Sequence, residues 1–290
     1  MSARADSMLY DGVFEGGGVR GIGLAGALSV FEAAGYRPYS VAGTSAGAIV
    51  STLVAAGYTA AEIKQIIMGI DFSRFEDPPL IGRIPRLGSI IDLIQHYGLY
   101  KGDYFHNLMR NLLAAKGVHT FRDLILSETA QDERYRYKVR VVTSDIVQGT
   151  MVVLPTDAAK YGVNPNDLDV SLAVRMSMSI PFFFYPVQQW GSYFVDGGLL
   201  SNYPLELFDS GGPPLYPTIG FLMYEPGTPR DALSLPNKIT GPFSAFEAML
   251  KTAANARDTW YMDQDKLART VRMDSLGIQA TDFQITKAQS

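Results

Sequence analysis

Cysteine is absent from this sequence of 290 residues. Without cysteine the chain has no disulfide framework, no thiolate nucleophile and no zinc site built on thiolate ligands. This composition is compatible with a reducing compartment but does not require one. Hydrophobic residues make up 47% of the chain, so we expect a packed interior rather than extensive disorder.

Positive charge is in slight deficit. The chain has 25 Lys and Arg residues against 29 Asp and Glu residues, a net charge of −4 at pH 7. A nucleic-acid-binding protein needs a concentrated basic face, so we expect no nucleic-acid partner. The charge does not argue against contact with a membrane surface, because apolar area alone can drive such docking.

No segment has the composition of a targeting or membrane-spanning sequence. Met1–Ser7 has no apolar stretch of the kind a secretory signal needs. Pro38–Ala61 has no charged residue and is long enough to cross a bilayer, but it is rich in Gly, Ser and Thr. It is more typical of a buried strand, a tight turn and a buried helix. We therefore expect no transmembrane segment and a cytoplasmic location, with peripheral membrane contact as an option.

The first part of the chain repeats the order strand, turn, helix. Met8–Phe14 is typical of a strand, and Val19–Ala34 of a helix that ends at Gly35. Tyr39–Ala42 and Ala46–Ala56 repeat the pattern. This order predicts parallel strands joined by crossovers. No linker interrupts the sequence, so we expect one domain over residues 1–290.

Further elements follow from local start and stop signals. Thr59 and Glu62 have the spacing of a capping box and predict a helix start. Asp103 can cap another helix, which runs through Lys116 and ends at Gly117. The other expected elements are a hairpin of strands Tyr137–Ile146 and Thr150–Leu154, a helix Val170–Ser177, a strand Ser192–Asp196, a helix Pro204–Asp209, a strand Thr218–Met223 and a helix Phe243–Leu267.

A stretch rich in Pro and Gly interrupts this pattern and predicts a flap at about residues 71–100, with a helix near Ser89–His96. Arg83 and Arg86 stand among apolar residues there. Such a surface could rest on an anionic bilayer, although core packing explains apolar segments more often.

A glycine turn follows the first strand. Gly16, Gly18 and Gly21 have the spacing of a dinucleotide-binding fingerprint, which also needs an acidic residue about 20 positions later. Ser40–Gly43 contains no acidic residue, so a nucleotide site is not favoured. Consecutive backbone N–H groups over Gly16–Val19 can instead form a nest of donors for an oxyanion.

A G-x-S-x-G sequence, Gly43–Gly47, follows the second strand. Between a strand and a helix, small residues on both sides allow the sharp turn that presents a strained nucleophilic serine, here Ser45. The alternative is a structural turn whose serine caps a helix. Ser45 alone does not decide between these two interpretations.

A serine nucleophile needs a base, and histidine is scarce. Only His96, His106 and His119 are present, and none lies in residues 120–290. His96, near the flap, is the one histidine that we keep as a candidate. Asp196 follows a predicted strand and precedes two glycines, which places a carboxylate where another backbone can approach closely. Taken alone, this Asp-Gly pair is more typical of an ordinary turn.

Together these motifs resemble the patatin-like phospholipase family. The resemblance rests on three segments in order, Gly16–Gly21, Gly43–Gly47 and Asp196–Gly198, and on Arg175–Pro181, which is similar to the segment that the family carries before its aspartate motif. It extends from about Met8 to Tyr203 and more faintly to the end of the chain. Glu15, where plant members have Asp, and Met176, which replaces a smaller residue, depart from the pattern.

The resemblance implies a fold and a mechanism. The fold would be a three-layer α/β/α sandwich with a mainly parallel central sheet. Ser45 would be the nucleophile and Asp196, partly desolvated, its general base. The oxyanion hole would come from Gly17 and Gly18, joined by Gly16 and Val19. The reaction would pass through an acyl-enzyme intermediate without calcium, another metal or a cofactor.

The resemblance also implies the substrate, a phospholipid or lysophospholipid at a membrane surface. Phe182 and Phe183 belong to an apolar run that could line an acyl channel, although such runs are more often core. Arg20 could meet a substrate phosphate or form a surface ion pair, and the sequence favours neither. Two alternatives remain, a soluble carboxylesterase or transacylase on the same scaffold, and a non-enzymatic membrane-binding module. A transacylase would need a histidine later in the chain.

Overall fold

The computed structural model of the chain describes residues 8–70, 72–75, 96–127, 131–209, 212–224, 239 and 242–276. Most of the predicted flap lies outside these ranges. The membrane-docking prediction for Arg83 and Arg86, and the helix predicted near residues 89–96 except for its last residue, also fall outside the described residues.

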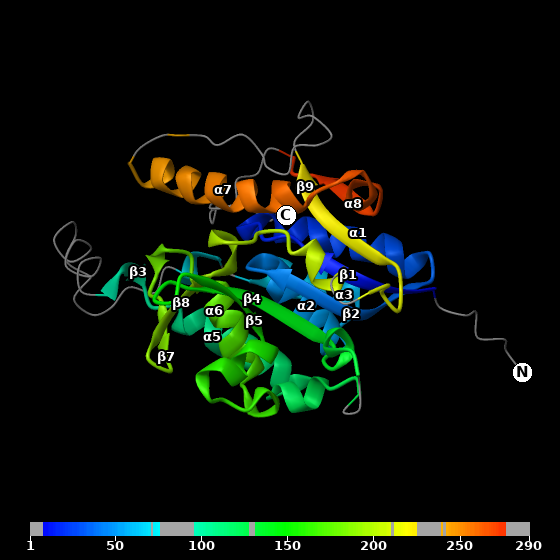
Figure 1. Cartoon of the computed structure of the whole chain (residues 1–290), viewed down its shortest axis with the longest axis horizontal. Helices are drawn as coiled ribbons and strands as arrows, with labels where there is room; N and C mark the ends of the chain where they lie inside the picture. The colour runs from blue at the N-terminus through cyan, green and yellow to red at the C-terminus, as the bar shows by residue number, and fades with distance from the viewer. Residues whose placement is uncertain are drawn as a thin grey trace, which may run out of the picture.

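An eight-stranded sheet forms the centre of the molecule (Figure 1), with the strand order β10-β9-β1-β2-β4-β8-β7 and β5 paired to β4. The pairs β10–β9, β9–β1, β1–β2 and β2–β4 are parallel, and β5, β8 and β7 pair antiparallel. The strands are β1 (Met8–Phe14), β2 (Tyr36–Thr44), β4 (Val139–Asp145), β5 (Thr150–Leu154), β7 (Val187–Gln189), β8 (Ser192–Asp196), β9 (Thr218–Tyr224) and β10 (Thr270–Asp274).

Helices flank this sheet, and Figure 1 shows α7 (orange) on one side of the molecule and α5 and α6 (green) on the other. Together with the strands they form the α/β sandwich with a mostly parallel sheet that the sequence predicts. In the described part of the chain, no helix is both long enough and apolar enough to cross a bilayer. The helices are α1 (Ile22–Ala33), α2 (Ala46–Ala55), α3 (Ala60–Gly69), α5 (Asp103–Ala115), α6 (Val170–Ser177), α7 (Pro242–Tyr261) and α8 (Gln264–Ala268).

Short 3-10 turns and a second, two-stranded sheet complete the fold. Strands β3 (Gly98–Tyr100) and β6 (Phe182–Phe184) pair parallel in that small sheet. The 3-10 turns are η1 (Gly18–Gly21), η2 (Phe72–Phe75), η4 (Phe121–Leu124), η5 (Glu133–Tyr135), η6 (Thr156–Tyr161), η7 (Pro165–Asp167), η8 (Gly197–Leu199) and η9 (Leu205–Phe208).

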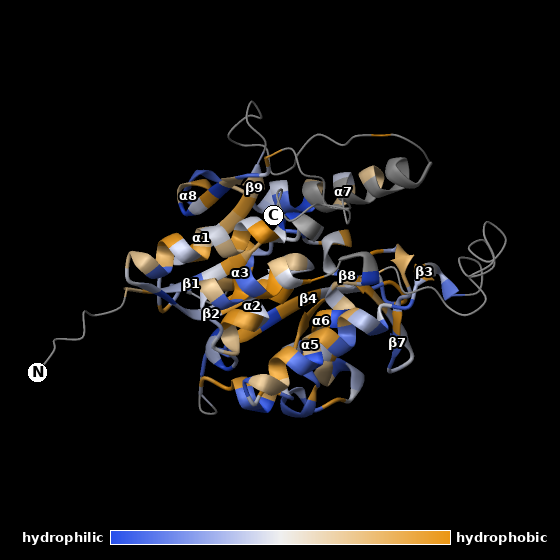
Figure 2. Ribbon diagram, turned by 180° about the vertical axis from the view of Figure 1, so that it is seen from behind, coloured by the Kyte–Doolittle hydropathy of each residue, from blue (hydrophilic) through white to orange (hydrophobic). Residues whose placement is uncertain are grey.

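The core divides between the two faces of the central sheet because side chains alternate along each strand. Phe14 of β1 and Phe221 of β9 join the larger hydrophobic cluster, with residues of α1, α2, α3, α5 and α6. Their neighbours Val13 and Leu222 join the smaller cluster, with residues of η5 and η9. Every residue of β4 is buried, as expected for a strand covered on both faces. The central strands are accordingly largely orange in Figure 2.

Local signals explain several boundaries. The capping box predicted at Thr59 and Glu62 is present and opens α3. Asp103, however, is not the cap of α5. That position belongs to Gly102, whose φ of 73° is easily reached only by glycine, and Asp103 is the first helical residue. A carboxylate in the first turn still interacts favourably with the helix dipole.

Three predicted helices differ from the structure. The helix expected from Val19 begins as the 3-10 turn η1, and α1 follows it. The segment expected as helix Pro204–Asp209 forms only the 3-10 turn η9. The long helix expected over Phe243–Leu267 is broken after α7, because the Asp263 side chain accepts the Lys266 N–H and starts α8.

Candidate active site

Ser45 lies on a sharp turn between β2 and α2. Its φ of 54° and ψ of −121° place it in a region that residues with a side chain rarely adopt. Gly43 and Gly47 make this turn possible. A Cβ on Gly43 would overlap the carbonyl oxygen of Gly47, and a Cβ on Gly47 would overlap that of Phe14. The sharp turn that the sequence predicts around Ser45 is therefore present, packed against the end of β1.

Ser45 and Asp196, the candidate catalytic dyad, meet because two strands end facing each other. Thr44, the last residue of β2, pairs with Val142 of β4, and Asp196, the last residue of β8, pairs with Thr143. Strand β5 occupies the other edge of β4 along residues 141–145. Strands β2 and β8 therefore share one edge of β4, run in opposite directions along it, and bring their carboxyl ends together.

Glycine and strand register maintain this arrangement. A Cβ on Gly197 would overlap the Val142 carbonyl oxygen and lie 3.0 Å from the Thr44 methyl group. A one-residue slip of β8 along β4 would turn the Asp196 side chain to the opposite face of the sheet. The chain must therefore have both the glycine and this register for the carboxylate to reach Ser45.

The two side chains form a short hydrogen bond. Ser45 Oγ donates to Asp196 Oδ2 at 2.7 Å. The other carboxylate oxygen, Oδ1, accepts the Gly198 N–H at 2.7 Å. One carboxylate oxygen of Asp196 thus forms an ordinary turn, and the other contacts Ser45. The sequence presents these two roles as alternatives, and the structure has both. Relative exposures of 5% for Ser45 and 7% for Asp196 show that both residues are buried, with little access to bulk water.

The three histidines have contacts elsewhere. The His96 ring stacks on Tyr185 at a centroid distance of 4.8 Å. His106 Nε2 lies 3.1 Å from Ser171 Oγ. The backbone N–H of His119 donates to Asp123. The carboxylate of Asp196 is therefore better placed than His96 to accept the proton of Ser45.

The segment Arg175–Pro181 holds both dyad residues in place. Ser177 Oγ accepts the Ser45 N–H at 2.9 Å and donates to the Val142 carbonyl at 2.6 Å. The Ser179 carbonyl accepts the Asp196 N–H at 2.9 Å. The sequence indicated this segment only through its resemblance to the family, since nothing in its spacing reveals these contacts.

Asn202, which the sequence did not indicate, forms hydrogen bonds with the glycine turn. Its carbonyl accepts the Gly16 N–H at 2.9 Å, and its Nδ2 donates to the Gly16 carbonyl at 2.9 Å. The same Nδ2 donates to Glu15 Oε1 at 3.1 Å. The first contact corrects one prediction. The Gly16 N–H already has a backbone partner, so Gly16 is not among the donors that we assign to an oxyanion.

The next three N–H groups are differently placed. The first donor inside η1 is Arg20, whose N–H bonds to the Gly17 carbonyl at 3.2 Å. Within this turn the N–H groups of Gly17, Gly18 and Val19 therefore have no carbonyl to bond to. Gly18 has a φ of 55°, which favours glycine. Gly16 lies beside the nucleophile, because a Cβ on it would stand 3.2 Å from Ser45 Cβ.

The residues predicted to bind substrate make contacts with other parts of the chain. Arg20 is half-buried, and its Nε donates to the Gly17 carbonyl at 3.3 Å. Phe182 and Phe183 belong to β6, where the Phe183 ring lies 4.8 Å from that of Tyr100. Phosphate binding by Arg20 and an acyl channel at the two phenylalanines stay predictions.

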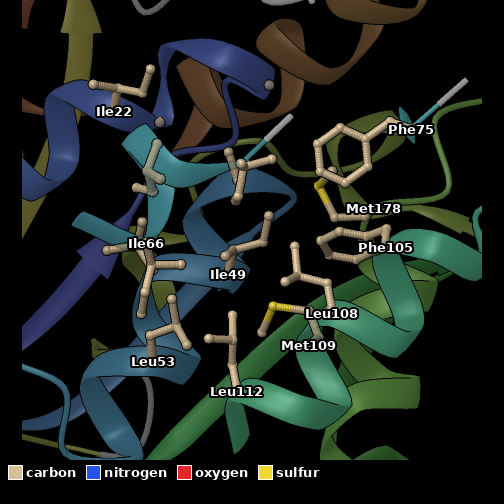
Figure 3. Close-up of a pocket in the computed structure, with 16 residues that line it drawn as sticks. Ile22, Ile49, Leu53, Ile66, Phe75, Phe105, Leu108, Met109, Leu112 and Met178 are labelled. Atoms are coloured by element: carbon tan, nitrogen blue, oxygen red, sulfur yellow. The ribbon is translucent and has the colours of Figure 1, made fainter. Parts of the chain in front are cut away.

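An apolar cavity of about 50 Å³ lies among η1, α2, α3 and α5. Phe75, Phe105 and Met178 lie toward one end, and Leu53 and Leu112 toward the other (Figure 3). Its wall is almost entirely hydrocarbon, as expected for a site that receives an alkyl chain. Phe182 and Phe183 do not line it.

The cavity adjoins the dyad. Gly18 of the glycine turn and Ala46, the residue after the nucleophile, contribute to its lining. Met178 is shared by both sites, since its Sδ lies 3.5 Å from Ser45 Oγ. Any group bonded to Ser45 therefore has an apolar space next to it.

Glu15 is a buried carboxyl group beside this site. Burial raises its pKa to about 7, although the charge of Arg20 opposes the shift. It accepts the Met223 N–H at 2.7 Å and the Asn202 amide. A carboxyl group with a raised folded-state pKa binds its proton more tightly in the folded protein. Its contribution to stability is therefore present below its ordinary value of 4.5 and is lost as pH rises through about 7.

We therefore expect the stability difference between wild type and Glu15→Gln to depend on pH. Gln does not titrate, so the advantage of the wild type should be greatest near pH 4 and should shrink by about 3 kcal/mol toward pH 8. Urea unfolding of both proteins across this range measures the difference. A constant difference would mean that Glu15 titrates at its ordinary value.

Comparison with known proteins gives the class of this chain. A sequence model described as patatin-like phospholipase matches residues 12–209. The chain belongs to this family, and the assignment supports a lipid hydrolase. The matched region contains Ser45, Asp196 and the glycine turn.

The same comparisons identify individual proteins that are similar to this chain. The chain is 37% identical over 284 residues to the uncharacterized protein YqhO of Bacillus subtilis (strain 168), covering 97% of this chain and 92% of that protein. It is 23% identical over 195 residues to "Probable lipid hydrolase 463L" of Invertebrate iridescent virus 6, covering 67% of this chain and 61% of that protein.

Among solved structures, the chain is similar to VipD from Legionella pneumophila, with 18% identity, a TM-score of 0.47 and coverage of 74% of this chain and 49% of that one. It is also similar to the type III effector protein ExoU from Pseudomonas aeruginosa, with 18% identity, a TM-score of 0.42 and coverage of 86% and 51%. The chain thus spans about half the length of these two structures.

Proposed function

We propose that this protein is a calcium-independent serine acyl hydrolase that cleaves fatty-acyl esters of phospholipids or lysophospholipids at a membrane surface. The observation that carries the proposal is the 2.7 Å hydrogen bond from Ser45 Oγ to Asp196 Oδ2 on a strained elbow. A nucleophile bonded to a base, next to backbone N–H groups at the start of a helical turn, is the arrangement that acyl transfer needs.

In the first step Asp196 Oδ2 takes the proton of Ser45 as Oγ attacks the ester carbonyl. The carbonyl oxygen becomes an oxyanion, which the N–H groups of Gly17, Gly18 and Val19 would bind. The tetrahedral intermediate then expels the alcohol of the lipid, which receives the proton held by Asp196. Water, activated by the same carboxylate, hydrolyses the acyl-enzyme and restores Ser45.

The apolar cavity supports a fatty-acyl substrate. It begins beside Ser45 at Met178 and extends between α2 and α5 toward Leu53 and Leu112. Its volume of about 50 Å³ leaves little room for an alkyl chain until side chains move. Met109 and Met178, both in the lining, are unbranched and can change rotamer to widen it.

The test is release of fatty acid from mixed phospholipid and lysophospholipid vesicles, with EDTA or with added calcium. We expect the wild type to release fatty acid at the same rate under both conditions and Ser45→Ala to release none. The released products identify the ester bond that is cut.

Two other outcomes would contradict the proposal. Loss of activity in EDTA would remove the calcium-independent mechanism. Turnover of short soluble esters without attack on vesicles would favour a soluble carboxylesterase.

A further inference from the structure

A buried carboxylate outside the dyad binds the loop that follows Asp196. Asp258, on α7, is 3% exposed. Its Oδ1 accepts the Ser201 hydroxyl at 2.8 Å, and its Oδ2 accepts the N–H groups of Asn202 and Tyr203, both at 2.8 Å. Three consecutive residues thus bond to one side chain, which fixes the backbone of residues 201–203.

The middle residue of that loop binds the glycine turn. Asn202 exchanges hydrogen bonds with both backbone groups of Gly16, at 2.9 Å each. A Cβ on Gly16 would overlap Asn202 Oδ1, so this contact is as close as glycine permits. The chain of contacts runs from Asp258 through Asn202 to Gly16, which directly precedes the proposed oxyanion donors.

We infer that Asp258 is a positioning residue for ester hydrolysis, which acts through Asn202 to set the place of the Gly17, Gly18 and Val19 N–H groups relative to Ser45. The inference rests on the proposed function. Residue 258 lies outside the 12–209 range that the family model matches. The role therefore belongs to a part of the chain that the motifs do not cover.

The charges around Asp258 are consistent with this role. Arg257 Nη1 lies 3.6 Å from its Oδ1 and also pairs with Glu206 at 2.9 Å. Among the described residues, the charge of Glu206 raises the pKa of Asp258, and the charge of Asp258 raises the pKa of the buried Glu15. Burial raises the pKa of Asp258 to about 6. At neutral pH the carboxylate is therefore ionised and can accept all three donors, whereas a protonated carboxyl would present one O–H donor to them.

The effect on rate follows from geometry. Asn at position 258 would keep one acceptor oxygen but turn an NH2 group toward a hydroxyl or backbone donor. Residues 201–203 would then shift, and Gly16 with them. Since a displacement of about 1 Å can cost about 10²-fold in rate, even a small shift of the oxyanion donors should be measurable.

The test compares Asp258→Asn with Asp145→Asn. Asp145 is a matched control because it is also buried and accepts backbone N–H groups, from Val147 and Gln148, together with the Tyr161 hydroxyl. Two readouts are used, kcat and KM on a soluble p-nitrophenyl ester, and the rate at which a fluorophosphonate labels Ser45. The fluorophosphonate adduct needs an oxyanion site but no lipid.

We expect Asp258→Asn to lower kcat and the labelling rate by about tenfold or more with KM unchanged. Asp145→Asn should lower Tm and change both rates much less than Asp258→Asn does. Asp258→Glu, which keeps the charge, should recover part of the loss. If Asp258→Asn does not fold, Asp258→Glu carries the test alone, because its longer side chain displaces the loop and should slow labelling.

A double variant tests the route through Asn202. Asn202→Ala removes the side-chain link to Gly16 and leaves the backbone link through the carbonyl of residue 202, so adding Asp258→Asn should slow this variant less than it slows the wild type. Effects that multiply, or a folded Asp258 variant that is labelled at the wild-type rate, would overturn the inference alone. A wild type that is never labelled would instead overturn the proposed function, and the inference with it.

Discussion

Replacing Asp196 by Asn is expected to lower kcat for ester hydrolysis by about 10⁴-fold or more and to leave the protein folded. Asn keeps an oxygen that can accept the Gly198 N–H, as Oδ1 of Asp196 does. Its NH2 group would then face Ser45 Oγ, which lies 2.7 Å from Oδ2 in the wild type. An NH2 group cannot take the serine proton, so the turn is retained and the base is lost.

Kinetics on a short soluble ester, with Tm measured in parallel, checks this prediction. Ser45→Ala gives the background rate, and the double variant should be no slower, because a nucleophile and its base act as a unit. A folded Asp196→Asn protein with nearly the wild-type kcat would place the base elsewhere. His96 would then be the next residue to replace.

Replacing Gly47 by Ala is expected to lower the free energy of unfolding by about 3 kcal/mol or more, at the upper end of the usual range for overpacking. The added methyl group would overlap the Phe14 carbonyl oxygen and lie 2.6 Å from that of Glu15. Both atoms are main-chain atoms at the end of β1, so no rotamer change can make room. Relief requires moving α2 or β1, and with either one the position of Ser45.

Gly26→Ala is the matched control for this substitution. Gly26 is an exposed glycine in the interior of α1, and a Cβ there would meet nothing within 4 Å. Alanine is the better helix former, so this variant should be more stable by up to about 1 kcal/mol. Urea unfolding of both variants measures the contrast. A Gly47→Ala protein as stable as the wild type would contradict the close packing of the elbow.

Elements whose signals are local could be predicted from the sequence. The strand Met8–Phe14, the helix Val170–Ser177 and the strand Ser192–Asp196 have the bounds that the sequence predicts. Their apolar patterns, with Asp169 capping the helix, contain the necessary information within a few residues. The mostly parallel sheet likewise follows from the repeated strand–turn–helix order.

Features that depend on distant partners could not be predicted. The small strands β3 and β6 exist because they pair with each other across 84 residues, and neither has a pattern of its own. Strand β10 likewise depends on its pairing with β9. Asp103 was assigned as a cap because its residue type favours caps, whereas the backbone freedom of Gly102 determined the boundary.

Some residues of the candidate site likewise have a local signal in the sequence, whereas others depend on distant partners. The elbow around Ser45 has a local signature, and Asp196 could be singled out only because three motifs in order resemble a family. Nothing in the sequence connects Asn202 to Gly16, or Asp258 to Asn202, since these pairs lie far apart along the chain. The neighbouring glycines predict that the Gly16 N–H is available to an oxyanion. In the structure it bonds to the carbonyl of Asn202, 186 residues away.

The distance between the dyad residues along the chain also has a consequence for synthesis. Ser45 and Asp196 are separated by 151 residues, and they meet only where β2 and β8 end on one edge of β4. As the chain leaves the ribosome, its N-terminal part can begin to fold first. A nascent or truncated chain that ends before Asp196 carries Ser45 without the carboxylate that we propose as its base. The contact between Ser45 and Asp196 therefore forms only after β8 has been made and has paired with β4.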